Sequence, residues 1–366
     1  MKQPALGLVA SAIIIALALA YVSLFSFETF VGWASYALMV LIPAEIVVGV
    51  AWGANPAFAA KLPQPIKGIV LVAVCVLAAA IIGPIYWQTV GGGLPQPAPM
   101  LIMCVITSVV ITFWLAIMFG GWPFNVMTKN QVASGILLWI GAYAINYGLF
   151  RVFFNYSFMA AAPVYNAALD PGGIFNASNA TVFYVTAVAI LFVLLHFDLW
   201  PLTLSPSIMK QPNLGIVWTL LALVLGGAAY YIGVDILGMD PMLFLVRVPV
   251  PFIFGTIIVL NMLHNSTFAS LQQPVKGIAN TAAAAVIGTA LALLYGAIAP
   301  TITGALNIGL PTNDFERWLA SALLGVTFPF LIFYAEFFKM WPLMPAAKPQ
   351  QAEPPPLPRN KLSKVE

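Results

Sequence analysis

The stretch QPIKGI (residues 64–69) returns almost unchanged as QPVKGI (residues 273–278). Looser copies of the same pattern, Gln-x-x-x-Gly-Ile, lie between them as QVASGI (131–136) and QPNLGI (211–216). Each copy stands at the start of an apolar run, where proline suits the first helical position and glycine lets a neighbouring backbone approach closely. Four copies at similar spacing favour internal duplication. The alternative is convergent loop chemistry, because Gln-Pro is common at membrane edges.

Composition assigns the chain to a membrane. Only 7% of its 366 residues are charged, whereas 62% are hydrophobic, and its mean hydropathy is +0.98. A soluble domain carries about 25% charged residues, so we expect the lipid bilayer to be the solvent of this chain. Its net charge of +3 is too small and too scattered to indicate a nucleic-acid partner.

Ten apolar runs are long enough to span the membrane, since a helix needs roughly 20 apolar residues to cross the hydrocarbon core. The runs are continuous rather than alternating, which excludes transmembrane β-strands. The sequence therefore predicts an all-α integral membrane protein with about ten transmembrane helices. The expected spans are residues 5–26, 33–53, 66–88, 100–120, 132–151, 182–198, 213–234, 242–264, 276–298 and 318–339.

The first run also resembles a secretory signal peptide, because residues 18–20 (ALA) are typical of a cleavage site. Its apolar character continues to about Phe27, which favours a first transmembrane helix over a cleaved signal.

The lysines indicate the orientation, because all of them fall on one side of this ten-span path. Glu28, Asp235 and Asp240 fall on the other side. The positive-inside rule places the lysine side and both termini in the cytoplasm, and we expect the inner (cytoplasmic) membrane of a bacterial cell. The lysines are Lys2, Lys61, Lys67, Lys129, Lys210, Lys276, Lys339, Lys348, Lys361 and Lys364.

The ten spans then group into five tandem helical hairpins, each of which begins and ends on the lysine side. We expect one transmembrane domain over residues 1–344, with repeats at roughly 1–58, 59–124, 125–202, 203–268 and 269–344. Residues 345–366 are rich in proline and polar residues, which predicts a disordered cytoplasmic tail.

Glu45 is the clearest candidate for binding a substrate or a proton, because a charge inside the membrane is costly. It lies about 15 Å from the outer end of its helix, near the bilayer midplane, and Pro43 interrupts the helical hydrogen bonds beside it. A carboxyl group at that depth would be neutral much of the time and can carry a proton or coordinate a cation. The alternative is a protonated carboxyl group that hydrogen-bonds to a neighbouring helix.

Arg247 is the second candidate for substrate binding. It stands in FLVRVPVPFIF (244–254), where Pro249 and Pro251 are expected to break the helix, and broken helices at membrane depth line cavities. An arginine beside such a break can receive an anion from the outer side. Alternatively, Arg247 extends to the membrane surface or pairs with an aspartate of the preceding loop.

His196 and His264 are weaker candidates for binding a haem or a metal ion. Both stand at the cytoplasmic ends of even-numbered helices, and an alignment of Trp200 with Phe268 makes them equivalent repeat positions. Only Asp198 stands close by as a further ligand. The alternative is that the two histidines solvate helix ends, so no cofactor is assigned.

The sequence lacks Walker, GxSxG, HExxH and CxxC motifs, so we favour a protein that is not an enzyme. Ten spans, proline-broken helices and Glu45 favour a permease or channel for a small solute or ion, with proton coupling through Glu45 as one option. One alternative is a membrane-anchor or redox subunit that binds haem, a metal or a quinone. Another is a non-catalytic scaffold that contacts other membrane subunits.

Overall fold

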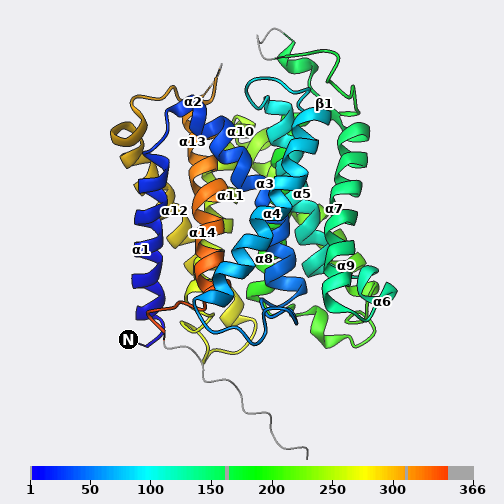
Figure 1. Cartoon of the computed structure of the whole chain (residues 1–366), viewed down its shortest axis with the longest axis vertical. Coiled ribbons are helices and arrows are strands. Elements are labelled where there is room, and N and C mark those ends of the chain that lie inside the picture. Colours follow the sequence, from blue (N-terminus) through cyan, green and yellow to red (C-terminus); the bar gives the residue numbers. More distant parts are fainter. Residues whose placement is uncertain (1, 161–164, 310–311, 345–366) are drawn as a thin grey trace, which may run out of the picture.

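The computed structural model describes residues 2–160, 165–309 and 312–344. The predicted tail lies outside these residues, and so do Lys348, Lys361 and Lys364. Within the described ranges ten helices are long and apolar enough to cross a membrane, which confirms the predicted class and the number of spans (Figure 1). They are numbered here as span 1 (Ala5–Val22), span 2 (Phe27–Ala51), span 3 (Ile66–Thr89), span 4 (Pro99–Met118), span 5 (Gln131–Phe153), span 6 (Ala177–His196), span 7 (Asn213–Ile236), span 8 (Pro241–Met262), span 9 (Val275–Thr303) and span 10 (Asp314–Phe337).

The odd-numbered spans are mostly single α-helices, whereas four of the five even-numbered spans end in a π-helical turn. The odd spans are α1 (Ala5–Val22), α4 (Ile66–Thr89), α7 (Gln131–Phe153), α9 (Asn213–Tyr230) with η6 (Tyr231–Ile236), and α12 (Val275–Thr303). The even spans are α2 (Phe27–Thr29), η1 (Phe30–Ala34), α3 (Ser35–Ile46) and η2 (Val47–Ala51); α5 (Pro99–Phe113) and η3 (Trp114–Met118); α8 (Ala177–His196); α10 (Pro241–Arg247), α11 (Pro249–Ile257) and η7 (Ile258–Met262); and α13 (Asp314–Ala320), η8 (Ser321–Thr327), α14 (Phe328–Ile332) and η9 (Phe333–Phe337).

The loops carry little regular structure. A parallel pair of two-residue strands, β1 (Phe154–Asn155) and β2 (Phe175–Asn176), joins the two ends of the long loop between spans 5 and 6. Short helical turns lie in the loops at α6 (Phe124–Met127), η4 (Ser157–Met159) and η5 (Leu202–Leu204). The chain starts, and span 10 ends, at the same end of the bundle as α6, the lower end in Figure 1. We call it the lysine end, because the loops with Lys61, Lys129 and Lys210 lie there.

The spans form two layers. In the even-numbered spans 56–72% of the residues in the most apolar stretch are buried, but in the odd-numbered spans only 22–44% are buried. The even spans contact one another in the closed order 2, 4, 6, 8, 10 and back to 2. They therefore form an inner ring of five helices, and the odd spans form an outer layer with one face left for lipid.

Each odd span lies in a groove between two neighbouring inner helices. Span 3 contacts spans 2 and 10, span 5 contacts spans 4 and 2, span 7 contacts spans 6 and 4, and span 9 contacts spans 8 and 6. Span 1 completes the series by packing on spans 8 and 10. Each odd span thus packs on two inner helices. For spans 3, 5, 7 and 9, one is the even span that precedes it in the sequence, and the other is the even span two numbers lower, with span 10 preceding span 2 in the ring. The predicted repeats are consecutive along the sequence. In the packed structure, however, each odd span contacts inner helices that belong to other repeats.

Glycine allows the closest of these contacts, between α11 and α12. A β-carbon on Gly288 would collide with the carbonyl oxygen of Pro251, and one on Gly255 would collide with the carbonyl oxygen of Ala284. Small residues at such positions let helix backbones touch, which is the main source of attraction between helices in lipid. The backbone contact fixes the distance between span 9 and the inner ring.

We therefore expect Gly288→Ala to destabilise the fold, because the added methyl group has no space and overpacking of this kind costs about 1–3 kcal/mol. Gly148→Ala is the matched control, since a β-carbon there meets no atom within 4 Å. That change should be neutral, or stabilising by up to about 1 kcal/mol through helix propensity. The free energy of unfolding in mixed micelles measures both effects. Equal values for the two variants would contradict the packing described here.

Candidate functional site

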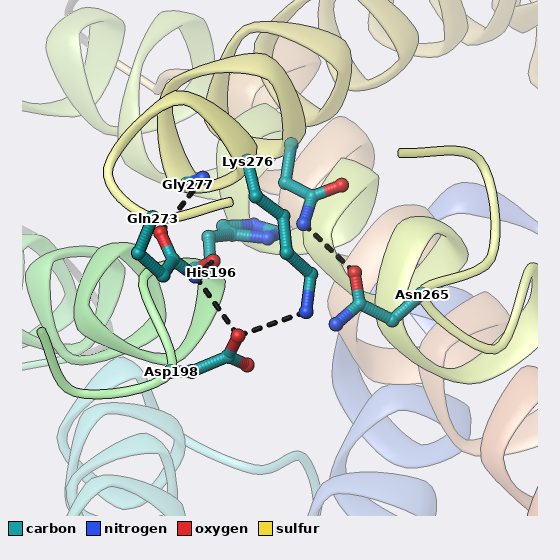
Figure 2. Close-up of polar contacts among 7 residues, drawn as sticks. His196, Asp198, Asn265, Gln273, Lys276 and Gly277 are labelled. Atoms are coloured by element: carbon teal, nitrogen blue, oxygen red, sulfur yellow. Dashed lines mark hydrogen bonds and ion pairs between the residues drawn. The ribbon is translucent and has the colours of Figure 1, made fainter. Parts of the chain in front are cut away.

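A glutamine at the start of each odd span fixes the ring at the lysine end. The Gln273 side chain donates from Nε2 to the carbonyl oxygen of His196 at 3.2 Å, and its Oε1 accepts from the N–H of Gly277 at 3.0 Å (Figure 2). Gln64 donates to the carbonyl oxygen of Phe337 at 2.6 Å and accepts from the Gly68 N–H at 3.2 Å. We call this arrangement the glutamine clasp. It satisfies one backbone carbonyl at the end of an inner helix and one N–H at the start of an outer helix.

Five glutamines donate in this way, one to each inner helix, and among the described residues all but Gln131 also accept from the glycine N–H. The donors Gln3, Gln64, Gln131, Gln211 and Gln273 reach the carbonyl oxygens of Met262, Phe337, Ala51, Met118 and His196, in that order. These five acceptor residues give the inner helices a common register. The first clasp was not predicted, although QPALGL (residues 3–8) carries the signal, because its last residue is leucine rather than isoleucine.

The glycine and the proline of the pattern act differently from the prediction. Gly68 faces the phenyl group of Phe338, and Gly277 faces that of Phe197, so the glycine mainly admits the side chain that follows the inner helix. The prolines occupy the N-cap position, and the helices begin one residue later, as α4 does after Pro65.

An ion pair reinforces the clasp of Gln273. Lys276 Nζ lies 2.8 Å from Asp198 Oδ2, which also accepts from Gln273 Nε2 at 2.9 Å (Figure 2). Burial alone would raise the pKa of Asp198, but the hydrogen bonds from Lys276 and Gln273 outweigh it and hold that pKa below its usual range. The carboxylate is half exposed, so this pair serves mainly to orient the loop.

Glu45 lies deep in span 2 and is 1% exposed. Among the described residues neither of its carboxylate oxygens has a hydrogen-bond partner. Cys75 belongs to α4, which packs on α3, and is near enough to feel the charge of Glu45. One turn further along span 2, in η2, the backbone of Gly49 approaches the ring of Phe337. Glu45 therefore faces the groove that holds span 3. Burying an unpaired carboxylate costs far more than burying the neutral acid, so this environment favours the neutral form.

Positions in the inner helices can be compared by counting back from each acceptor residue, a numbering that we call the clasp register. It shows which residues stand level with Glu45 in the other inner helices. Glu45 precedes the acceptor residue Ala51 by six residues, as Thr256 precedes Met262 and Leu331 precedes Phe337. Thr256 hydrogen-bonds to the side chain of His196 in the neighbouring inner helix. Glu45 therefore places a carboxyl group where the other inner helices carry a threonine or an apolar residue.

His196 is fully buried as the last residue of α8. Its Nε2 lies 3.0 Å from Thr256 Oγ1, and its ring stands nearly edge-on to that of Phe252. Its Nδ1 has no partner among the described residues. The imidazole thus bridges spans 6 and 8 at the lysine end.

His264 occupies a different position. It is exposed and lies in the turn after span 8, with a left-handed backbone at φ 50°. In the clasp register the residue equivalent to His196 is Met262, whereas the alignment of Trp200 with Phe268 pairs His196 with His264, two residues further along. Among the described residues, no group of three or more His, Cys, Asp or Glu side chains lies close enough to hold a metal ion.

Arg247 is the last residue of α10. The helix is interrupted at Val248, and α11 begins at Pro249. The predicted break is therefore present, but α11 continues through Pro251. The side chain of Arg247 is exposed on the bundle. Asp240 is engaged elsewhere, because its carboxylate caps α10 by accepting from the N–H groups of Met242 and Leu243.

A cavity of about 90 Å³ lies inside the inner ring, and all five inner helices line it. Its walls are almost wholly apolar. Thr181 is the one polar lining residue in the described part of the chain, and its hydroxyl donates to the carbonyl oxygen of Ala177. The sequence could not predict this cavity, because it depends on closure of the ring. Lining residues from spans 2, 4, 6, 8 and 10 include Ile42, Val109, Phe113, Val185, Ile253 and Phe328.

No protein-family model, no curated protein and no solved structure matches this chain.

The clasp makes a testable contribution to stability. Gln64→Ala leaves the carbonyl oxygen of Phe337 without its donor, and an unsatisfied buried acceptor costs about 1–3 kcal/mol. Gln131→Ala is the matched control, because Gln131 is exposed and its bond to the Ala51 carbonyl is 3.4 Å long. We expect that control to cost less than about 1 kcal/mol, measured as the free energy of unfolding in mixed micelles. A larger loss in Gln131→Ala than in Gln64→Ala would overturn the role assigned to the clasp.

Proposed function

We propose that the chain is a membrane permease or channel in which a small solute or ion moves along the axis of the inner ring. The observation that supports this proposal is the axial cavity, to which all five inner helices contribute side chains. A cavity that every inner helix lines responds to small shifts of any of them. This suits alternating opening and closing better than it suits a rigid scaffold.

Proton coupling through Glu45 is part of the proposal. Glu45 is buried in the groove beside span 3, outside the cavity wall, and no residue in the described part of the chain hydrogen-bonds to its carboxyl group. A carboxyl group that gains or loses a proton there changes the cost of keeping that groove closed. The groove borders the inner helix that contributes Ile42 to the cavity, so protonation can bias the shape of the cavity.

The orientation belongs to the same proposal. The lysine end faces the cytoplasm with both termini, because the loops there carry Lys61, Lys129 and Lys210. Each repeat then crosses the membrane outward and back as a hairpin, and the membrane is the inner membrane of a bacterial cell.

The redox alternative is less well supported. A haem or a metal ion held by two histidines requires both imidazoles to face one space, but His196 is buried against Thr256 whereas His264 is exposed. A haem absorption band lost in His196→Ala would favour that alternative. The scaffold reading would be favoured if the protein were stable only with another subunit.

The flux prediction uses purified protein in vesicles that contain a pH-sensitive dye. Addition of the small-molecule fraction of a cell extract, under an imposed pH gradient, should change the internal pH about tenfold faster than in empty vesicles, as expected for a proton-coupled carrier. Glu45→Gln keeps the shape but cannot exchange a proton, so it should lose the response. Glu28→Gln, an exposed carboxylate at the other end of the bundle, should retain it. A wild-type protein that behaves like empty vesicles contradicts the proposal.

The orientation is tested by labelling single cysteines with a membrane-impermeant maleimide. Lys129→Cys and Lys210→Cys should react only after the cells are permeabilised, whereas Gln96→Cys, in the exposed loop between spans 3 and 4, should react in intact cells. The native Cys75 and Cys104 are buried and give little background. Labelling of Lys129→Cys and Lys210→Cys on opposite faces would refute the proposed path.

A further inference from the structure

Two phenylalanines meet across the axis of the inner ring. Phe113 belongs to span 4 and Phe328 to span 10, and these spans are not neighbours in the ring order. Their aromatic centroids nevertheless lie 6.2 Å apart at 83°, an edge-to-face contact. Side chains from two non-adjacent inner helices can touch only through the middle of the ring, so this pair occupies the axis.

Phe192 of span 6 supports the pair from one side. Its centroid lies 5.4 Å from that of Phe113, again edge-to-face at 77°. Aromatic pairs of this geometry are held by about 0.5–1.5 kcal/mol beyond the apolar area that they bury. Phe113 is therefore fixed on two sides, and it forms the boundary of the axial cavity toward the lysine end.

The clasp register places Phe113 along the axis. Phe113 precedes the acceptor residue of span 4, Met118, by five positions. The lining residue Ala320 precedes the acceptor residue of span 10, Phe337, by seventeen. At 1.5 Å per residue the cavity reaches about 18 Å from Phe113 toward the opposite end. Toward the lysine end, Asn261 of span 8 and Glu336 of span 10 are partly exposed and hydrogen-bond at 3.0 Å. This pair lies about 6 Å from the level of Phe113 along the axis.

The levels of this polar pair and of Phe113 are thus about one helical turn apart, and along the axis Phe113 lies between the pair and the cavity. An apolar cavity of about 150 Å³ stays free of water, and the axial cavity is smaller and equally apolar. Hydrophobic constrictions of this kind stop ions because a continuous column of water does not form in them.

The geometry points to Phe113, held by Phe328 and Phe192, as the gate that closes the axial path to water and ions. This inference rests on the proposed permease or channel function and names the residue that controls its path. In the closed arrangement the axis admits no charged solute. A solute passes when the edge-to-face pair separates, which requires spans 4 and 10 to move apart by about the thickness of an aromatic ring, roughly 3.5–4 Å.

The test measures potassium loss from vesicles that contain the full-length protein. Wild-type vesicles should retain potassium as well as empty ones. Phe113→Ser puts a hydroxyl group and space on the axis, so water can enter, and potassium loss should be about tenfold faster or more. Phe113→Leu keeps the axis apolar and should stay much closer to wild type.

Phe150→Ser is the matched control, because it removes a buried phenylalanine of α7 that packs on Phe154 and Tyr156, away from the axis. It should not leak. If Phe113→Ser does not fold, Phe328→Ser removes the other half of the pair and should leak in its place. Circular dichroism and gel filtration establish folding for each variant.

The outcomes separate this inference from the proposed function. Folded Phe113→Ser and Phe328→Ser proteins that hold potassium as tightly as wild type would overturn the gate, even if the pH-dye assay shows flux. Rapid potassium loss through the wild-type protein would also overturn it, while leaving the axial path intact. A leak in the two gate variants with no flux in the dye assay would retain the gate and weaken the proton-coupled permease.

Discussion

The last backbone carbonyl groups of each inner helix need hydrogen-bond donors from outside the helix. This requirement shapes the whole bundle. Four of the five acceptor residues, Met118, His196, Met262 and Phe337, are fully buried, so an unsatisfied carbonyl oxygen there is costly. A glutamine at the start of an outer helix supplies the donor, and it can do so only when that outer helix lies in one particular groove. Five repetitions of the same bond set the register of ten helices. The following glycine leaves room for the side chain after each inner helix, so hydrogen bonding and packing select the same arrangement.

Much of the fold was predictable from the sequence, because lipid exposure demands long apolar runs whose number can be counted. The ten spans and the break at Val248 followed from residue type alone. The closed ring did not, since Gln64 gives no sign in the sequence that its partner is Phe337, far along the chain. The repeat boundaries suggested helix pairs within a repeat, whereas the glutamines join helices of different repeats. A pattern shows that a residue recurs, but not what it touches.

The candidate site could be predicted only where a single residue differs in chemical character from the residues around it. Glu45 stood out as a carboxyl group within an apolar helix, and within the described ranges it is buried with no hydrogen-bond partner. The two histidines were paired by aligning Trp200 with Phe268, but Trp200 follows its acceptor residue by four positions whereas Phe268 follows Met262 by six, an offset of the loop that the sequence alone does not reveal. Phe113 could not be recognised, since one phenylalanine among 25 gains a special position only after the ring has closed. Cavities and axial contacts arise from assembly of the helices.

The order of the ring has a consequence for biogenesis. Span 1 is made first, but the inner helices on which it packs, spans 8 and 10, are made late, and span 3 also needs span 10. Synthesis runs from the N-terminus, so span 1 lacks both of its inner partners, and span 3 lacks one of its two, until translation is almost complete. A ribosome that stops before span 10 leaves two grooves unformed and the Gln64 amide unbonded. In such a truncated chain the Gln64 amide lacks its acceptor at the lysine end, whereas the finished chain pairs it with the Phe337 carbonyl oxygen as the last inner helix takes its place.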